Sequence, residues 1–253
     1  MIEGSLVHYE TTGRGRPVVF LHGWLGSWRY WMHAMEEVSG AARAYAFDLW
    51  GFGDTDRSKG RRLVGDFAHQ LEGFLEAMGI GRITLVGHAL GAATAIKFAG
   101  LQPARVERLM AVSLPLSSRA VNRKGLAGGW SPPGGYRWQD YDELVDELKK
   151  ADPSVLEPSI ASLDEADLPA GLSALTMPTL LVHGARDPLV KLPAIEPILA
   201  RNGNVHLIQF DDSRHFPMLE ERGKFDRLIK DFLAAGDDVR SLELKDEWRR
   251  RTR

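Results

Sequence analysis

The chain has 253 residues, of which 44% are hydrophobic, and this is enough apolar material for a sizeable buried core. Its 32 Lys and Arg residues nearly balance its 34 Asp and Glu residues, and the net charge of −2 excludes long-range attraction to nucleic acid or anionic membranes. The absence of cysteine excludes a thiol nucleophile, a disulfide framework and Cys-based metal sites. We therefore expect a small, uncharged molecule as the partner.

The N-terminal stretch, MIEGSLVHYE, is polar and alternating, whereas a secretion signal begins with a basic stretch followed by an apolar run. No segment approaches the roughly 20 apolar residues that a membrane-spanning helix needs. The sequence therefore predicts a protein with no membrane span and a cytoplasmic location.

Short apolar runs alternate with helical patterns along the chain, and such runs suit the strands of a parallel sheet that is buried on both faces. Between the second and third runs, apolar residues from Val64 to Met78 recur at i, i+3, i+4 and i+7, as in an amphipathic helix. The alternation predicts an α/β fold with a doubly wound, mostly parallel sheet. The expected strands are residues 18–23, 44–49, 83–88, 108–113, 179–184 and 205–210.

One interval, from Leu114 to about Pro169, has no convincing strand and holds a Pro- and Gly-rich stretch with helical patterns after it. Because a long excursion from the sheet of a compact domain is usually functional, we expect a small helical cap over the strand ends, inserted after the sixth strand. An ornamental surface insertion is the alternative. The predicted division is a core of residues 1–113 and 170–253 and a cap or lid of residues 114–169.

The segment LVGHALGAA, residues 85–93, runs from an apolar strand directly into a helical pattern. Within it, Gly87-His88-Ala89-Leu90-Gly91 departs only at its middle residue from the Gly-x-Ser-x-Gly nucleophile elbow. The central residue of that turn is strained, and its neighbours must be small for the backbones to approach. An ordinary glycine-bounded turn between a strand and a helix is the alternative.

Two further residues follow predicted strands in the order that such an elbow requires. Asp187, in HGARDPLV, comes after the next-to-last strand, and His215, in DDSRHFPMLE, comes after the last. Open α/β sheets build their sites at the carboxyl ends of strands, where all three segments lie. Taken singly, Asp187 fits a loop or capping residue and His215 a helix-start residue; taken together with Ala89, they predict a catalytic triad.

A fourth segment, LHGWLGSW at residues 21–28, follows the first long apolar strand. Its small residues allow the loop to bend over the elbow, so that the backbone N–H groups of Trp24 and Leu90 point at one developing oxyanion. We expect His22 to brace this loop by hydrogen bonds. Asp48, in the glycine-bent stretch DLWGFGDTD, is expected to be structural.

With these motifs the sequence resembles the α/β-hydrolase superfamily. HGWLGS, DLWGFGDTD, GHALGAA, LLVHGARDPLV and SRHFPMLEE are similar to that family's markers and come in its order, over nearly the whole chain outside the cap and tail. The resemblance implies the α/β-hydrolase fold, with Asp187 as acid, His215 as base, Trp24 and Leu90 as oxyanion donors and Ala89 at the nucleophile position. It leaves the substrate open, because esterases, thioesterases, lactonases, C–C hydrolases and some lyases share the markers.

The methyl group of Ala89 can neither attack a carbonyl nor give a proton to His215. The hypothesis we favour is a deliberate Ser-to-Ala change in an intact esterase-like enzyme, because every other element of the site remains. A natural ligand-binding protein or receptor that keeps the pocket is one alternative. A cofactor-free lyase or oxygenase that uses His215 as a base is the other.

The pocket is expected to be aromatic, and aromatic walls with few fixed charges suit a small apolar ester-type substrate: a carboxylester, a thioester or a lactone. No metal or organic cofactor is expected, because the chain has no metal-ligand motif and no phosphate-binding loop after the first strand. The sequence does not show where Arg29, Arg119 and Arg137 lie relative to the pocket. The candidate pocket residues are Trp24, Trp28, Trp50, Trp130, Trp138 and Met218.

Overall fold

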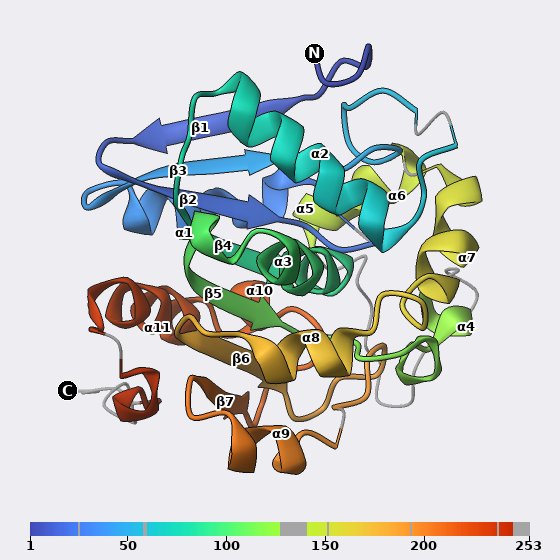
Figure 1. Ribbon diagram of the computed structural model, residues 1–253. Helices are drawn as coiled ribbons and strands as arrows, with labels where there is room; N and C mark the ends of the chain where they lie inside the picture. Colours follow the sequence, from blue (N-terminus) through green and yellow to red (C-terminus); the bar gives the residue numbers. More distant parts are fainter. Residues whose placement is uncertain are drawn as a thin grey trace, which may run out of the picture.

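The computed structural model describes residues 1–24, 26–57, 60–126, 141–150, 152–192, 194–236 and 238–244. These residues form a seven-stranded sheet in the order β1-β3-β2-β4-β5-β6-β7 (Figure 1). Among them, β1 pairs antiparallel with β3, and the other neighbouring strands pair in parallel. The strands are β1 Tyr9–Gly13, β2 Arg16–Leu21, β3 Ala42–Phe47, β4 Ile83–His88, β5 Val106–Val112, β6 Thr179–Gly184 and β7 Val205–Phe210.

The six predicted strands are present within two residues of their expected bounds, and the doubly wound, mostly parallel sheet is confirmed. The central strands β4 and β6 are buried at every residue, which explains their continuous apolar runs. The sequence did not predict β1, because its residues YETTG lie at the sheet edge and carry no apolar run.

Helices cover both faces of the sheet (Figure 1). On one face α2 (Val64–Ala77) and α8 (Leu168–Ala174) pack on either side of α3 (Leu90–Leu101), which lies against β4 and β5. On the other face α1 (Met32–Val38) packs against α11 (Arg222–Ala234). Because α3 is enclosed by these neighbours, its sequence LGAATAIKFAGL is apolar almost all round and rich in small residues.

The remaining helices are short. In the cap region α4, α5, α6 and α7 gather at the side to which the arrowheads of the parallel strands point (Figure 1). Their bounds are α4 Arg123–Leu126, α5 Asp142–Val145, α6 Glu147–Lys150 and α7 Pro153–Ala161. The other short elements are η1 Trp28–Trp31, η2 Pro103–Arg105, η3 Ser118–Ala120, α9 Glu196–Arg201, α10 Pro217–Glu220 and η5 Val239–Ser241.

The cap does not follow a sixth strand, as expected, but follows β5, the fifth strand of the described chain. The count was wrong, because only four of the six expected strands and the unpredicted β1 precede the cap. The proposed core boundary at residue 170 falls inside α8, whose packing against α3 makes it part of the core layer.

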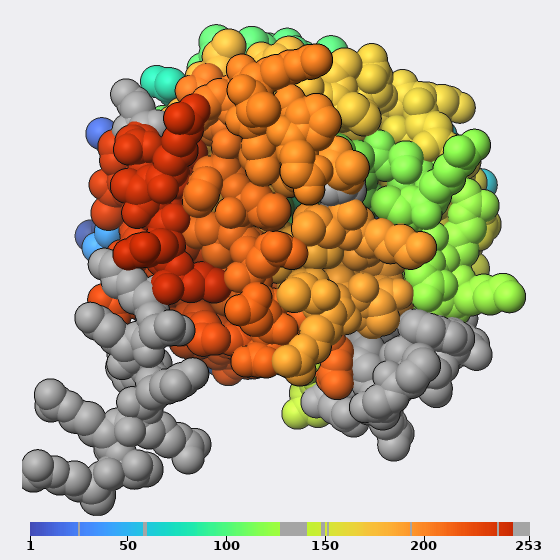
Figure 2. All heavy atoms as spheres, turned by 90° about the horizontal axis from the view of Figure 1, so that it is seen from below, coloured from blue at the N-terminus to red at the C-terminus, as the bar shows by residue number. Residues whose placement is uncertain are grey.

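The segment before α4 pairs with the loop after β6. Val121 and Val190 form an antiparallel bridge, and Asn122 N donates to Leu189 O at 2.7 Å. In Figure 2 the green segment that contains α4 accordingly lies against the orange segment that follows β6. This pairing fixes the loop that carries Asp187. No helix in the described ranges has the length and apolar character that crossing a membrane requires.

Candidate active site

Ala89 lies between the end of β4 and the start of α3, fully buried, with φ 49° and ψ −109°. This conformation costs a non-glycine residue about 1 to 3 kcal/mol. The turn is so tight that a Cβ atom on Gly91 would lie 2.4 Å from the backbone oxygen of Leu21. The elbow therefore has the strained geometry that the sequence motif predicts, with a methyl group at its apex.

His215 and Asp187 form a buried pair. His215 Nδ1 lies 2.9 Å from Asp187 Oδ2, and the two side chains are 2% and 0% exposed. The second carboxylate oxygen of Asp187 accepts backbone N–H groups from Leu189 at 2.8 Å and Val190 at 3.0 Å. The carboxylate thus fixes the imidazole through Nδ1.

The pKa of the Asp187 carboxyl reflects two opposing causes. Burial alone would raise it, but the facing His215 and the hydrogen bonds to the carboxylate bring it below its ordinary value. Asp187 is therefore a carboxylate at neutral pH, and it can stabilise a positive charge on the His215 imidazole.

The elbow and the histidine loop are in contact. The rings of His88 and His215 have centroids 4.6 Å apart, and His88 Nε2 donates to the backbone oxygen of His215 at 2.9 Å. The loop after β2 joins them, because a Cβ atom on Gly23 would lie 2.9 Å from Cβ of Ala89. The loop after β2 and the histidine loop therefore both contact the elbow segment.

The candidate oxyanion donors lie beside this contact. Leu90 is the first residue of α3, where backbone N–H groups have no acceptor within the helix. Trp24 follows Gly23 and is 3% exposed, and its indole N–H donates to Ser159 Oγ on α7 at 2.8 Å. The loop of one candidate donor is thus tied directly to the cap.

His22 braces the same loop. Its Nδ1 bonds the backbone oxygen of Gly23 at 2.8 Å, and its Nε2 accepts from Leu49 N at 2.9 Å. Because Leu49 N can only donate, the proton of the neutral ring is on Nδ1. Burial lowers the pKa of His22, which keeps the ring neutral.

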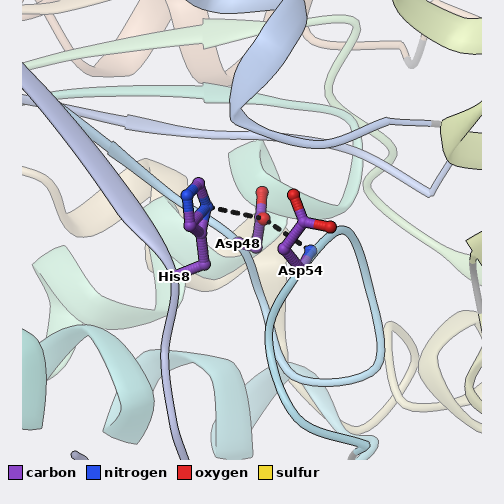
Figure 3. A group of neighbouring side chains, drawn as sticks. All are labelled: His8, Asp48 and Asp54. Carbon is purple, nitrogen blue, oxygen red and sulfur yellow. Dashed lines mark hydrogen bonds and ion pairs between the residues drawn. The ribbon is translucent and has the colours of Figure 1, made fainter.

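His8, Asp48 and Asp54 form a second polar cluster, which Figure 3 shows at the loop after β3. Asp48 Oδ2 faces His8 Nδ1 at 3.4 Å and accepts from Asp54 N at 2.9 Å, while Oδ1 accepts from Trp28 N at 2.8 Å. The three side chains are close enough to bind a metal ion. We interpret the cluster as structural, because Lys150 and Arg29 already neutralise Asp54 at 2.9 and 3.1 Å.

The tryptophans expected in the pocket have different environments. Trp28 packs beside His8 at 5.9 Å between ring centroids and lies under Arg29. Trp50 is buried, and the Arg61 guanidinium lies 4.5 Å from its ring centroid. Met218 is buried on α10, and Trp24 is the candidate in the loop that touches the elbow. Trp130 and Trp138 lie outside the described residues.

Two of the arginines that sequence left unplaced have carboxylate neighbours. Arg29 bonds Glu147 at 2.9 Å as well as Asp54. The positive charge of Arg119 contributes to lowering the pKa of Asp164, after the larger effect of the Ser118 hydrogen bonds. Arg137 lies outside the described residues.

Sequence reasoning missed three residues that contact the site: Tyr30, Ser113 and the role of His88. The Tyr30 hydroxyl lies 3.0 Å from His88 Nδ1, and Ser113 Oγ donates to the backbone oxygen of His215 at 3.2 Å. Ser113 has φ 49°, as Ala89 does, and both directly follow a strand. The sequence offered one signal for Ser113: this polar residue ends the apolar run before the cap.

Known proteins resemble this chain over most of its length. Residues 18–228 match the model of the Alpha/beta hydrolase family. The chain is 30% identical over 264 residues to 2-hydroxy-6-oxo-2,4-heptadienoate hydrolase of Pseudomonas putida, covering 92% of this chain and 95% of that protein. It is 26% identical over 243 residues to the pimeloyl-[acyl-carrier protein] methyl ester esterase of Nitrosomonas europaea, covering 84% and 94%. The enol-lactonase of Burkholderia xenovorans superimposes with a TM-score of 0.79 at 17% identity, covering 92% and 98%.

Proposed function

Because this chain belongs to the alpha/beta hydrolase family, we propose that it is the nucleophile-less form of a hydrolase that acts on a small, apolar, ester-type substrate. The substrate would be a carboxylester, a thioester or a lactone. One observation carries the proposal: Ala89 keeps the strained elbow conformation beside an intact, buried pair of His215 and Asp187.

In the parent enzyme, a serine at position 89 attacks the substrate carbonyl. His215, held by Asp187, takes the serine proton, and the N–H groups of Trp24 and Leu90 hold the oxyanion. His215 then protonates the leaving group and activates the water that hydrolyses the acyl-enzyme. The charge that develops on the imidazole is balanced by the Asp187 carboxylate, whose lowered pKa keeps it ionised.

The alanine form cannot make the acyl-enzyme. Loss of the nucleophile from a triad typically lowers kcat by about 10⁶, while oxyanion-hole and binding contributions remain. Such a protein retains the capacity to bind substrate or product. This combination is what a Ser-to-Ala change in an otherwise intact enzyme produces, and it is the origin that we propose for Ala89.

Two arginines in or against the cap are already paired with carboxylates, which favours an uncharged substrate. Arg29 is paired with Glu147 and Asp54, and Arg123 on α4 is paired with Glu157 on α7 at 3.3 Å. An anionic substrate would have to compete with these carboxylates. The similarity to a methyl ester esterase and an enol-lactonase supports an ester-type carbonyl.

The test is the Ala89→Ser variant, assayed with p-nitrophenyl butyrate and with a fluorophosphonate that labels activated serines. We expect burst kinetics and labelling, with both lost when His215→Ala is added. The unchanged chain is the negative control. If Ala89→Ser neither hydrolyses nor labels, while either form binds a ligand without converting it, the protein is a ligand-binding one. Turnover by the alanine form itself that His215→Ala abolishes would indicate a lyase or oxygenase.

A second candidate is hydrolysis of a carbon–carbon bond. It is favoured by the 30% identity to a 2-hydroxy-6-oxo-2,4-heptadienoate hydrolase over 92% of this chain. That compound carries a carboxylate, so the pairing of Arg29 and Arg123 with acidic residues argues against it. Offering the Ala89→Ser variant both compounds separates the two functions: a higher kcat/KM for the dienoate than for p-nitrophenyl butyrate selects the second. Cytoplasmic location stays a prediction, which cell fractionation tests.

A further inference from the structure

A continuous chain of hydrogen bonds joins the loop after β2 to the histidine loop. Gly23 N donates to the Tyr30 hydroxyl, which lies 3.0 Å from His88 Nδ1. His88 Nε2 lies 2.9 Å from the backbone oxygen of His215, and Ser113 Oγ reaches the same oxygen at 3.2 Å. Tyr30, His88 and Ser113 are at most 1% exposed, so water does not compete for these bonds.

The direction of every bond follows from the two ends of the chain. A backbone N–H only donates, so the oxygen of Tyr30 accepts from Gly23 and its single proton goes to His88 Nδ1. Nδ1 is therefore an acceptor, and neutral His88 carries its proton on Nε2. That proton meets the carbonyl of His215, which only accepts. The network has one consistent proton arrangement, with every group satisfied.

Both side chains are kept neutral in this arrangement. Burial, followed by the nearby His215, lowers the pKa of His88 well below its ordinary value, while the carbonyl of His215 and the Asp187 carboxylate oppose this and His22 adds to it. Burial raises the pKa of Tyr30 well above its ordinary value, with Asp48 adding to it and the Gly23 bond opposing it. The chain of bonds therefore joins neutral groups.

We propose that Tyr30 and His88 are positioning residues, which lock the loop that carries the Trp24 oxyanion donor to the loop that carries His215. The inference rests on the proposed function, because it assigns these side chains to the alignment of the same triad. Tyr30 holds the backbone N–H of Gly23, the residue before Trp24. His88 and Ser113 hold the backbone of His215, and Asp187 holds its ring.

The loop after β2 packs tightly against the elbow. A Cβ atom on Gly23 would lie 2.9 Å from both Cβ of Ala89 and Nδ1 of His88, so the loop backbone lies directly on the elbow. Misplacing catalytic groups by about 1 Å can cost about 100-fold in rate. Release of the Tyr30 bonds is therefore expected to affect the chemical step more than substrate binding.

The kinetic test uses the Ala89→Ser enzyme with p-nitrophenyl butyrate. Adding Tyr30→Phe should lower kcat by about 10- to 100-fold with less than about a threefold change in KM. His88→Gln keeps a donor for His215 but loses the ring nitrogen opposite Tyr30, so it should fall between the starting enzyme and His88→Leu. The matched control is Tyr45→Phe, which removes the hydroxyl of another buried tyrosine, on β3. A change in KM alone, or an equal loss in Tyr45→Phe, overturns the proposal.

A second measurement needs no activity and uses the alanine chain. Nitrogen-15 NMR should show His88 protonated on Nε2, and Tyr30→Phe should increase amide exchange at Gly23 and in the histidine loop together. If Tyr30→Phe leaves the His88 signals and both exchange rates unchanged, the locking role is wrong. An inactive Ala89→Ser enzyme would reject the proposed function, and the NMR result would still decide whether Tyr30 and His88 lock the two loops.

Discussion

The His215–Asp187 pair and the His8–Asp48 pair both lie at strand ends, and they differ in how the carboxylate is used. Asp187 gives one oxygen to His215 at 2.9 Å and the other to backbone N–H groups, with both side chains buried. Asp48 gives both oxygens to backbone N–H groups, and His8, 29% exposed, approaches at 3.4 Å. The first arrangement orients an imidazole, whereas the second stabilises a loop. Proximity of the two residue types therefore does not identify a catalytic pair.

The pKa values of the two carboxyl groups follow the same distinction. Burial raises the pKa of Asp48, and the opposing effects of His22 and two backbone N–H groups do not overcome it. The pKa of Asp187 is lowered despite burial, because His215 acts on it both by charge and by a hydrogen bond. The direct hydrogen bond to an imidazole thus distinguishes Asp187, whose pKa is lowered, from Asp48, whose pKa is raised.

The strongest test of the difference between the two pairs is to remove each imidazole from the Ala89→Ser enzyme. His215→Ala should lower kcat by about 10⁶, the loss typical of a triad histidine. His8→Ala should change kcat by less than about threefold, because His8 contacts the structural carboxylate. Hydrolysis of p-nitrophenyl butyrate measures both. Comparable losses in the two variants would mean that the pairs were assigned wrongly.

Replacing each carboxylate by an amide gives the next largest contrast. Asp187→Asn should lower kcat of the Ala89→Ser enzyme by about 10⁴, because the imidazole is then held in the wrong tautomer. Asp48→Asn should act on folding instead. Its new N–H₂ group faces backbone donors, which costs about 1 to 3 kcal/mol in the free energy of unfolding. Steady-state kinetics and urea denaturation check the two effects, and a dominant loss of kcat in Asp48→Asn contradicts the structural role.

A change of pH should distinguish the two pairs, because the contributions of Asp187 and Asp48 to the free energy of unfolding change with pH in opposite directions. The lowered pKa of Asp187 means that its carboxylate stabilises the folded state above the unfolded pKa, and this contribution is lost as pH falls through the folded pKa. The raised pKa of Asp48 has the opposite sign: its contribution is largest below the unfolded pKa and declines as pH rises through the folded pKa. The loss of stability in Asp187→Asn should therefore grow from about pH 3 to pH 6, and that in Asp48→Asn should shrink. Urea denaturation of the alanine chain at each pH measures this; equal slopes would reject it.

The smallest effect concerns the link from the elbow region to the cap. Ser159→Ala removes the acceptor of the Trp24 indole and should lower the free energy of unfolding by about 1 kcal/mol, since it leaves a buried N–H unpaired. In the Ala89→Ser enzyme a severalfold fall in kcat/KM is expected. Ser173→Ala is the control, because the hydroxyl of this exposed serine donates to the Pro169 oxygen in its own helix. Identical behaviour of the two variants would show that the contact is dispensable.

Sequence predicted the parts of the site that depend on chain order. Strand ends of a parallel sheet converge, so Asp187 and His215 were expected together near Ala89, and their hydrogen bond is present; their catalytic roles stay predictions. The contact of Tyr30 with His88 was not predictable, because a hydrogen bond between side chains 58 residues apart leaves no periodic pattern. Trp28 has the i, i+3 spacing from Trp31 that suits packing onto the core, and Trp28 is partly buried against the core cluster that contains Trp31.

The strained turn at Ala89 also bears on the history of the protein. Glycine adopts positive φ at little cost, so a lineage long free of any reaction at this position would gain stability by replacing the alanine. Under the proposed Ser-to-Ala origin, the backbone strain that residue 89 still holds favours a recent loss of the hydroxyl.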